Sequence, residues 1–289
     1  MARTLTPLLA CACLAAGAIH AETSEYPQLL NLPTADRMQF WDISAGFSHR
    51  FVEPVKGASK DLYGLDGMSY SGFGFCFGIK PISGLNVFIY RTPDNKTLTL
   101  GFQEQILNGT YFRMAVRASG FDEGIPATTT AVGKYGISGG TLQVPMEIYF
   151  TDDIMLLLVP TYITRTTTTD TILTVPADQP PNTTPNTGGV FNVGLGLRIG
   201  FTEKFSFMAE YYPRPSKFAK AVPGGIDGRT KYEAGLTAGF SYRTFKHRFT
   251  LLGTNTVGTA DNQVLSGDYG GGPRPMSQWS LGFNITRIF

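Results

Sequence analysis

Two histidines beyond residue 21, His49 and His247, are the side chains best suited to acid–base chemistry in this sequence. A lipid hydrolase would need a serine within hydrogen-bond reach of such an imidazole. The strands assigned below place His49 near one end of its strand and His247 near the opposite end of another, so the two cannot share a site. His49 could meet a serine on a neighbouring strand, but a polar residue at a membrane interface is the simpler explanation for it.

Sequence patterns for metals and nucleotide cofactors are weak. The sequence holds no Cys or His cluster, and Asp152-Asp153 is most simply a polar turn. The glycines of Gly194-x-Gly196-x-x-x-Gly200 have the wrong spacing for a dinucleotide loop and lie within a strand. We therefore expect no catalytic residues, no metal and no cofactor.

Charged and phenolic side chains recur on strand faces that otherwise carry small polar residues. This set of candidate lumen-lining residues consists of Arg113, Arg117, Glu147, Tyr149, Arg198, Glu210, Tyr212 and Glu233. Charge rings in a wet lumen can select a solute. The same groups could instead neutralise one another and fill a small barrel, with Arg113 or Arg117 pairing with Glu147 on the next strand. Three arginines against three glutamates predict no solute charge.

The elements that must position these side chains are β-strands, and the clearest is the stretch 276–289. Successive side chains of a strand point to opposite faces. One face is apolar and ends on an aromatic ring; its residues are Trp279, Leu281, Phe283, Ile285 and Phe289. The other face is small or polar and carries Gln278, Ser280, Gly282, Asn284 and Thr286. This pattern is typical of a transmembrane barrel strand with aromatic girdles.

Composition indicates an exported chain that enters a membrane. Arg3, the apolar run 5–19 and Ala21 are typical of a signal peptide, so we expect residues 1–21 to be removed, with Ala18 as the alternative cleavage site. Of the 24 Lys and Arg residues, 23 then remain against 22 Asp and Glu, which argues against a nucleic-acid partner. Charged residues make up 16% of the chain, whereas ordinary soluble domains carry roughly 25%. No later stretch approaches the roughly 18 apolar residues of a spanning helix.

The same alternation recurs in twelve segments. They are 41–51, 70–80, 85–91, 96–106, 111–119, 141–150, 154–165, 190–200, 205–212, 231–242, 247–256 and 276–289. The segment 154–165 is apolar on both faces, so its orientation is ambiguous. The connections mostly alternate long and short, except for the short link 92–95, and residues 22–40 form a periplasmic lead-in that could fold up into the barrel.

These features predict an all-β fold, a transmembrane up-and-down antiparallel β-barrel of about 12 strands over residues 41–289 with both termini periplasmic. An even strand number with short periplasmic turns is typical of outer-membrane barrels. The alternative is a soluble β-sandwich or barrel with its apolar face inward. Against it, the second face carries Gly, Ser, Thr, Asn and Gln rather than the Lys and Glu of a water-exposed surface.

Six blocks of sequence add a family resemblance. They are LPTA (32–35), SHRF (48–51), LYGLD (62–66), PTY (160–162), EYYPR (210–214) and GFNITRIF (282–289). Their types and order resemble a family of bacterial outer-membrane β-barrel proteins, domain of unknown function 5777. The resemblance implies an outer-membrane barrel and brings no catalytic or binding residues.

The final strand also resembles that of outer-membrane proteins in general. This resemblance implies recognition by the barrel-assembly machinery, through Leu281, Phe283, Ile285 and Phe289, although Arg287 departs from the apolar residue usual at its position. The expected partners are therefore this machinery and outer-membrane lipid.

Three functions remain open from the sequence. The first is a narrow outer-membrane channel for small hydrophilic solutes. The second is a closed structural or interaction barrel that docks partners through its loops, with the lead-in or loops filling the bore. The third and weakest is an enzyme that modifies envelope lipid.

Overall fold

We analysed a computed structural model, which describes residues 27–55, 65–66, 68–79, 84–93, 96–124, 136–164, 189–213, 234–266 and 278–289. The predicted signal peptide, the first residues of the lead-in and Glu233 lie outside these ranges. Among the described residues, no helix is long and apolar enough to cross a membrane.

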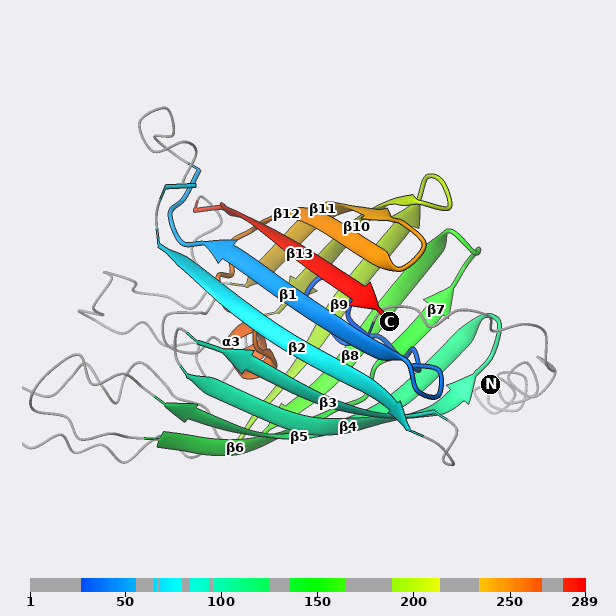
Figure 1. Cartoon of the computed structure of the whole chain (residues 1–289), viewed down its shortest axis with the longest axis horizontal. Helices are drawn as coiled ribbons and strands as arrows, with labels where there is room; N and C mark the ends of the chain where they lie inside the picture. The colour runs from blue at the N-terminus through cyan, green and yellow to red at the C-terminus, as the bar shows by residue number, and fades with distance from the viewer. Residues whose placement is uncertain are drawn as a thin grey trace, which may run out of the picture.

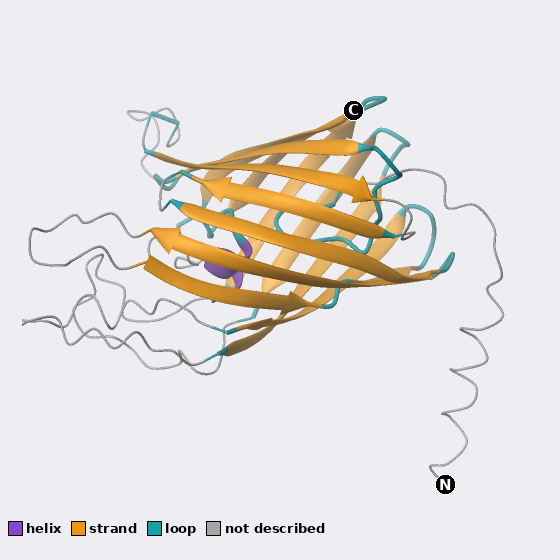
Figure 2. Ribbon diagram, turned by 60° about the horizontal axis from the view of Figure 1, so that its bottom comes forward, coloured by secondary structure: helices purple, strands orange, loops and turns teal. Residues whose placement is uncertain are grey.

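The structure is a closed antiparallel β-barrel (Figures 1 and 2). Its strands are β1 (Ile43–Phe51), β2 (Ser69–Ile79), β3 (Leu85–Thr92), β4 (Thr97–Asn108), β5 (Phe112–Gly124), β6 (Gly136–Gln143), β7 (Met146–Tyr149), β8 (Ile154–Ile163), β9 (Val190–Gly200), β10 (Phe205–Tyr212), β11 (Gly235–Arg243), β12 (His247–Thr254) and β13 (Ser280–Ile288). Except for β6 and β7, each strand pairs with its neighbours in sequence, and β13 closes on β1 with Ser48 opposite Asn284. The predicted fold class is confirmed.

The barrel has twelve strand positions because β6 and β7 together occupy one of them. Both lie between β5 and β8, and the break between them falls at Val144-Pro145. Proline has no backbone N–H to give to a ladder. The segment predicted as 141–150 is therefore a single strand interrupted at its proline.

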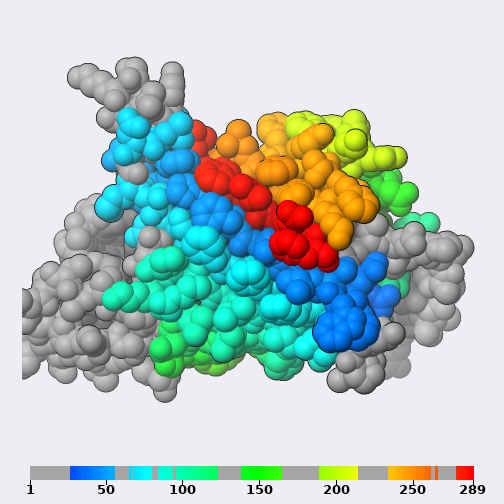
Figure 3. Space-filling model, in the orientation of Figure 1, coloured from blue at the N-terminus to red at the C-terminus, as the bar shows by residue number. Residues whose placement is uncertain are grey.

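The side chains alternate between an apolar outer face and a mostly small or polar inner face. Phe73, Phe102 and Leu195 lie on the outside and are 47%, 51% and 37% exposed. The outer face is continuous across β13, β1 and β2 (Figure 3). A barrel in hydrocarbon turns its apolar side chains outward, so the orientation predicted for the alternating faces is confirmed.

The ambiguous segment 154–165 contains β8, whose inner face is itself apolar. Met155, Leu157 and Val159 point inward and are at most 2% exposed. Leu156 and Leu158 face outward and are only partly buried. An apolar inner face requires apolar partners inside the barrel.

Several strands have bounds that differ from the sequence assignment. Strands β5 and β6 reach Gly124 and Gly136, so the connection between them is shorter than the stretch 120–140 that separates the predicted segments 111–119 and 141–150. Their extra pairs bury Phe121, which a reading of local polarity does not detect. Strand β1 begins at Ile43 rather than residue 41 because Trp41 has a positive φ of 68°, which belongs to a turn and not to a strand.

The two ends of the barrel differ in their connections. One end carries the short turns, including Phe150–Asp153 and Phe201–Lys204, together with the start of β1 and the C-terminal Phe289 (Figure 1). The opposite end carries the longer connections and the short link between Thr92 and Thr97. We call these the short-turn end and the long-loop end. That the short-turn end is periplasmic stays a prediction.

Candidate functional site

The lumen is occupied by the chain's own N-terminal part, residues 27–38, which we call the plug. It makes a tight turn in which the Leu29 amide donates to the Leu32 carbonyl at 2.8 Å and Thr34 donates to Pro27 at 3.2 Å. Leu29, Leu30 and Leu32 are at most 2% exposed. Residues 27–38 of the predicted lead-in thus lie inside the barrel, whereas Gln39 and Phe40 are exposed.

The plug is not a strand of the sheet, so its backbone groups need other partners. An unpaired buried amide or carbonyl costs about as much as a lost hydrogen bond. Side chains on the inner wall meet this need. The Glu210 carboxylate on β10 accepts the amides of Leu30 at 2.8 Å, Asn31 at 3.0 Å and Leu32 at 2.9 Å.

The side chain of Asn31 is held from both sides of the lumen. Its Nδ2 donates to the Glu210 carboxylate at 3.2 Å and to the Tyr212 hydroxyl at 3.1 Å. The buried Arg50 guanidinium on β1 donates to its Oδ1 at 2.8 Å and to Asn284 Oδ1 on β13 at 2.8 Å. Asn284 in turn donates to the Leu30 carbonyl at 2.7 Å. The turn of the plug is therefore fixed across the closure of the barrel.

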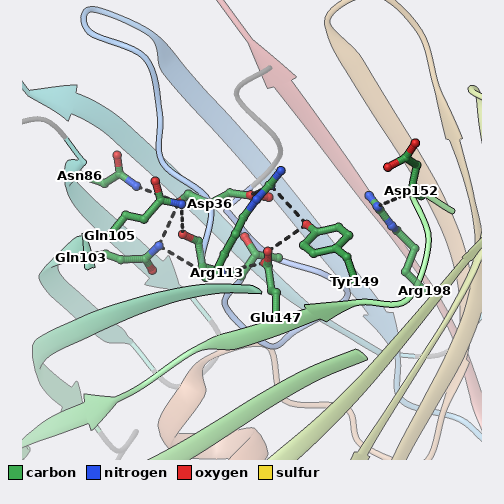
Figure 4. A network of polar contacts seen from close by, with 11 residues as sticks. Asp36, Asn86, Gln103, Gln105, Arg113, Glu147, Tyr149, Asp152 and Arg198 are labelled. Carbon is green, nitrogen blue, oxygen red and sulfur yellow. Dashed lines mark hydrogen bonds and ion pairs between the residues drawn. The ribbon is translucent and has the colours of Figure 1, made fainter. Parts of the chain in front are cut away.

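A second group of wall residues holds the next part of the plug (Figure 4). Gln103 on β4 donates to the carbonyls of Thr34 and Asp36, both at 3.0 Å. Gln105 donates to the Ala35 carbonyl at 2.9 Å. These hydrogen bonds are made to backbone carbonyls of the plug and not to its side chains.

Two more wall residues complete this second group. The Glu147 carboxylate on β7 accepts the Ala35 amide at 2.8 Å, and Asn86 Oδ1 on β3 accepts the Met38 amide at 2.9 Å. Both hydrogen bonds are made to backbone amides of the plug, so neither depends on a plug side chain.

One ion pair ties the plug to β5. Arg113 Nη1 lies 2.7 Å from Asp36 Oδ1, and their side chains are 18% and 5% exposed. The same Arg113 nitrogen donates to the Tyr149 hydroxyl at 3.2 Å, and that hydroxyl donates to Glu147 at 2.9 Å. Arg248 on β12 donates to the carbonyls of Gln28 and Leu29, the latter at 3.1 Å. The charges of this wall thus face the plug directly.

Inward glycines make room for the plug. A Cβ built on Gly194 would lie 2.5 Å from Leu32 Cδ2, and one on Gly196 would lie 2.8 Å from Leu29 Cδ2. On Gly78 it would lie 2.0 Å from the Gln39 carbonyl oxygen. The small residues that alternate along these strands therefore accommodate a peptide.

A second insertion fills the lumen from the long-loop end. It follows β12 and contains the short helix α3 (Asp261–Ser266), which lies inside the barrel mouth (Figure 2). Asn192 Nδ2 on β9 donates to the Leu265 carbonyl at 2.7 Å. Arg117 pairs with Asp261 at 3.4 Å. Burial raises the pKa of the Asp261 carboxyl, and the Arg117 guanidinium partly counters this.

Plug, insertion and wall share one apolar cluster. It joins Leu29, Leu30 and Leu32 of the plug with Val264 and Leu265 of the insertion. Its wall members include the inward face of β8. The plug and the insertion therefore both pack against the apolar inner face of β8, the face that made segment 154–165 ambiguous.

Among the cavities that remain beside the plug, two are lined by described residues of both plug and wall. One, of about 50 Å³, is bounded by residues of β1 to β3 together with Arg117, Arg248 and Asn284. The other, of about 240 Å³, lies at the short-turn end and is lined by charged residues that include Asp36, Arg198 and Arg243. Arg248 lines both cavities. It therefore stands between the space at the mouth and the space inside.

The predicted lumen-lining residues can now be placed. Arg113, Arg117, Glu147, Tyr149, Glu210 and Tyr212 point into the barrel and contact the plug, the insertion or one another. Arg198 lines the cavity at the short-turn end, with its guanidinium 5.8 Å from the Tyr149 ring centre. Arg113 and Glu147 lie directly opposite each other in the register of β5 and β7. Glu233 lies outside the described residues.

The residues of the predicted assembly signal belong to the outer face or the free end of β13. Leu281, Phe283, Ile285 and Phe289 lie there, and Phe289 is 52% exposed at the short-turn end. Arg287 also points outward, with its guanidinium 4.7 Å from the Phe289 ring centre. This stacking lets a charged side chain occupy a position that is otherwise apolar.

Sequence reasoning missed several inner-wall residues that hold the plug. Arg50, Asn86 and Arg248 all have the strand parity of inward neighbours, so the alternation itself could have identified them. The alternation does not predict that these residues bind the plug, because the plug itself has no strand period.

The Ser–His possibility has a concrete counterpart on the outside. His49 Nδ1 lies 3.1 Å from Ser71 Oγ on β2. The imidazole stacks on Phe283 at 5.0 Å and meets Phe51 edge-on at 4.7 Å. It thus belongs to an aromatic patch on the outer face, far from the lumen. His247 lies at the short-turn end, opposite Arg287.

In the part of the chain that the structure describes, no group of three or more His, Cys, Asp or Glu side chains is placed to hold an ion. Cys76 is a free, buried thiol on the inner face of β2.

The outward apolar wall and the lumen filled by inserted chain define a membrane-bound β-barrel. The chain belongs to the family described as membrane bound beta barrel domain, DUF5777, whose model matches residues 25–289. The resemblance seen in the sequence is thereby confirmed.

Solved structures with similar architecture are distant in sequence. An outer membrane channel from Pseudomonas putida F1 has a TM-score of 0.48 at 11% identity, over 93% of this chain and all of that one. The NanC porin has a TM-score of 0.44 at 7% identity, over 86% and 98%. LpxR from Salmonella typhimurium has a TM-score of 0.38 at 10% identity, over 86% and 100%. Comparison with curated proteins finds no match.

Proposed function

We propose that this protein is an outer-membrane channel for small hydrophilic solutes, closed in the present structure by its plug. The plug is the gate, and its displacement toward the short-turn end opens the bore. Because it precedes β1 and enters from that end, it can leave without any strand being separated.

The observation that supports the proposal most directly is how the wall holds the plug. Glu210, Glu147 and Gln103 bind its backbone through side-chain hydrogen bonds rather than through a β-ladder. Water can replace each of these partners when the plug leaves, since the wall groups are polar. The bore that remains has a largely hydrophilic wall, as a conduit for polar solutes needs.

The second insertion is compatible with this role. A short segment held at one mouth by Asn192 and Arg117 narrows a passage and limits the size of the solute. We therefore expect small currents even when the plug has moved.

Planar bilayer recordings of the full-length mature protein test the proposal. Changing the turn of the plug, Leu30→Ser with Asn31→Ala, removes its apolar and polar contacts and leaves the wall intact. We expect rare, brief openings of the wild type and frequent, long openings of this variant. The matched control, Leu65→Ser with Asp66→Ala, alters two exposed residues beyond the barrel wall and should behave like the wild type.

Folding of each variant is checked by its migration on unheated gels. If the folded plug variant shows no resolvable openings over long recordings, the channel proposal is wrong.

The competing function is a closed barrel that serves as a scaffold for partners at its loops. The apolar cluster shared by plug, insertion and β8 favours it, because that cluster must be broken to open the bore. Under this alternative the plug variant loses stability without gaining conductance. The same recordings, combined with the unfolding temperature, therefore separate the two functions.

A further inference from the structure

We propose that the bore of this barrel selects small anions, with Arg248, which lines both of the cavities described above, as the residue that sets the selectivity. The inference rests on the proposed channel function and adds the charge class of the solute.

The charges on the inner wall are strongly unequal. Among the inward side chains that the structure describes on the strands, six are arginines: Arg50, Arg113, Arg117, Arg198, Arg243 and Arg248. Two are glutamates, Glu147 and Glu210. The wall thus carries an excess of positive charge that a low-dielectric surrounding amplifies.

The plug partly offsets this excess while it is in place. Asp36 of the plug lies 2.7 Å from Arg113 and lines the cavity at the short-turn end. When the plug leaves, Asp36 leaves with it and the Arg113 guanidinium faces the bore. Opening therefore makes the wall more positive.

The interior cavity already has the character of an anion site. Among the described residues that line it, the charged ones are Arg117 and Arg248, which are 6% and 8% exposed, and Arg117 pairs with Asp261 of the insertion at 3.4 Å. Hydroxyl and amide groups of Ser44, Thr286 and Asn284 also line it and can donate hydrogen bonds. No carboxylate is among the described residues that line this space, whereas the cavity at the mouth is lined by charges of both signs.

Arg248 is placed where these two spaces meet. It lines both cavities, and its guanidinium donates to the Gln28 and Leu29 carbonyls of the plug. A solute that moves from the mouth, where acidic turns face basic side chains, to the interior cavity meets this guanidinium in both spaces. Once the plug has moved, the donors that held its carbonyls are available to an anion.

Reversal potentials in a potassium chloride gradient test the inference on full-length protein that carries the plug change Leu30→Ser with Asn31→Ala. We expect the current of this background to prefer chloride over potassium. Adding Arg248→Gln should lower the chloride-to-potassium permeability ratio at least about twofold, because it removes a buried positive charge that lines both cavities. Arg248→Lys keeps the charge and should keep the preference.

The control is Arg91→Gln, which removes the same charge from an exposed, outward-facing position on β3. A potassium preference of the background would overturn the inference, as would a change caused equally by Arg91→Gln, or a ratio unaffected by Arg248→Gln. In these cases the channel proposal stands. If the background shows no openings at all, the channel proposal fails and the inference fails with it.

Discussion

The carboxylate of Glu210 accepts the backbone amide of Asn31 at 3.0 Å, across 179 residues of sequence. This contact joins a strand in the second half of the barrel to a segment that precedes the first strand. It shows how the wall captures the plug: a charged acceptor on a rigid strand meets several amides of one turn. Bonds of this kind, with one charged partner, are among the stronger ones in proteins.

Replacing Glu210 by Gln should loosen the plug while preserving side-chain shape. A neutral amide accepts more weakly, and it presents an NH₂ group to backbone amides. We expect a loss of about 3 kcal/mol in plug docking, roughly a hundredfold in the open-to-closed ratio. Single-channel recordings measure the open fraction, and Glu53→Gln, at an exposed position, is the control. An open fraction equal in both variants would contradict the assigned role of Glu210.

A larger side chain on the wall beneath the plug should also displace the plug, by steric collision and not by loss of hydrogen bonds. In Gly194→Val the added atoms collide with Leu32, whose Cδ2 lies 2.5 Å from where a Cβ would sit. Overpacking of this kind costs about 1–3 kcal/mol, which the plug relieves by moving out. Protease cleavage near residue 30 reports the displacement, and Gly253→Val on the outer face of β12 is the control. Unchanged protection of the plug would mean that Leu32 adapts in place.

The outward face should tolerate charge only near its ends. Leu251 lies in the middle of β12 and is 65% exposed, whereas Phe245, 95% exposed, lies in a short turn. Arginine near the bilayer midplane costs about 2–4 kcal/mol and near the interface about 0–1 kcal/mol. Leu251→Arg should therefore lower folding stability in lipid vesicles far more than Phe245→Arg. Equal losses would place the membrane elsewhere on the barrel.

His49 should be dispensable for any chemistry. Its ring contacts Phe283 and Phe51, and the hydrogen bond to Ser71 at 3.1 Å fixes it within an aromatic patch. We expect no phospholipid hydrolysis by the wild type above the rate in buffer, and none by His49→Ala. If the wild type releases fatty acid and both His49→Ala and Ser71→Ala lose that activity, the enzyme hypothesis returns.

The sequence predicts the strands of the barrel wall better than the plug and the insertion that lie inside the barrel. Alternation at period two placed Phe73 outside and Glu147 inside because both follow the pleat of a strand. The same rule left β8 undecided, since Leu157 packs against inserted chain rather than water. The break at Pro145 and the positive φ of Trp41 are local events that period alone does not register.

The plug itself could not be derived from its own residues. Residues 27–38 have no strand or helix period, and their partners lie far away in the sequence. Asn31 is recognised by Arg50, Glu210 and Tyr212, which come together only when the barrel is closed. The sequence therefore predicts that the inner wall is polar. It does not predict that these polar side chains bind a segment of the same chain.

The positions of these partners along the chain also bear on the order in which the barrel closes and the plug docks. The plug is synthesised before all of the strands, yet its anchor Asn284 lies on the last strand and Arg50 on the first. These two side chains meet only at the seam where β13 joins β1. The contacts of Arg50 and Asn284 with the plug therefore need the sealed barrel, and we expect the plug to reach its full set of hydrogen bonds only after β13 has paired with β1.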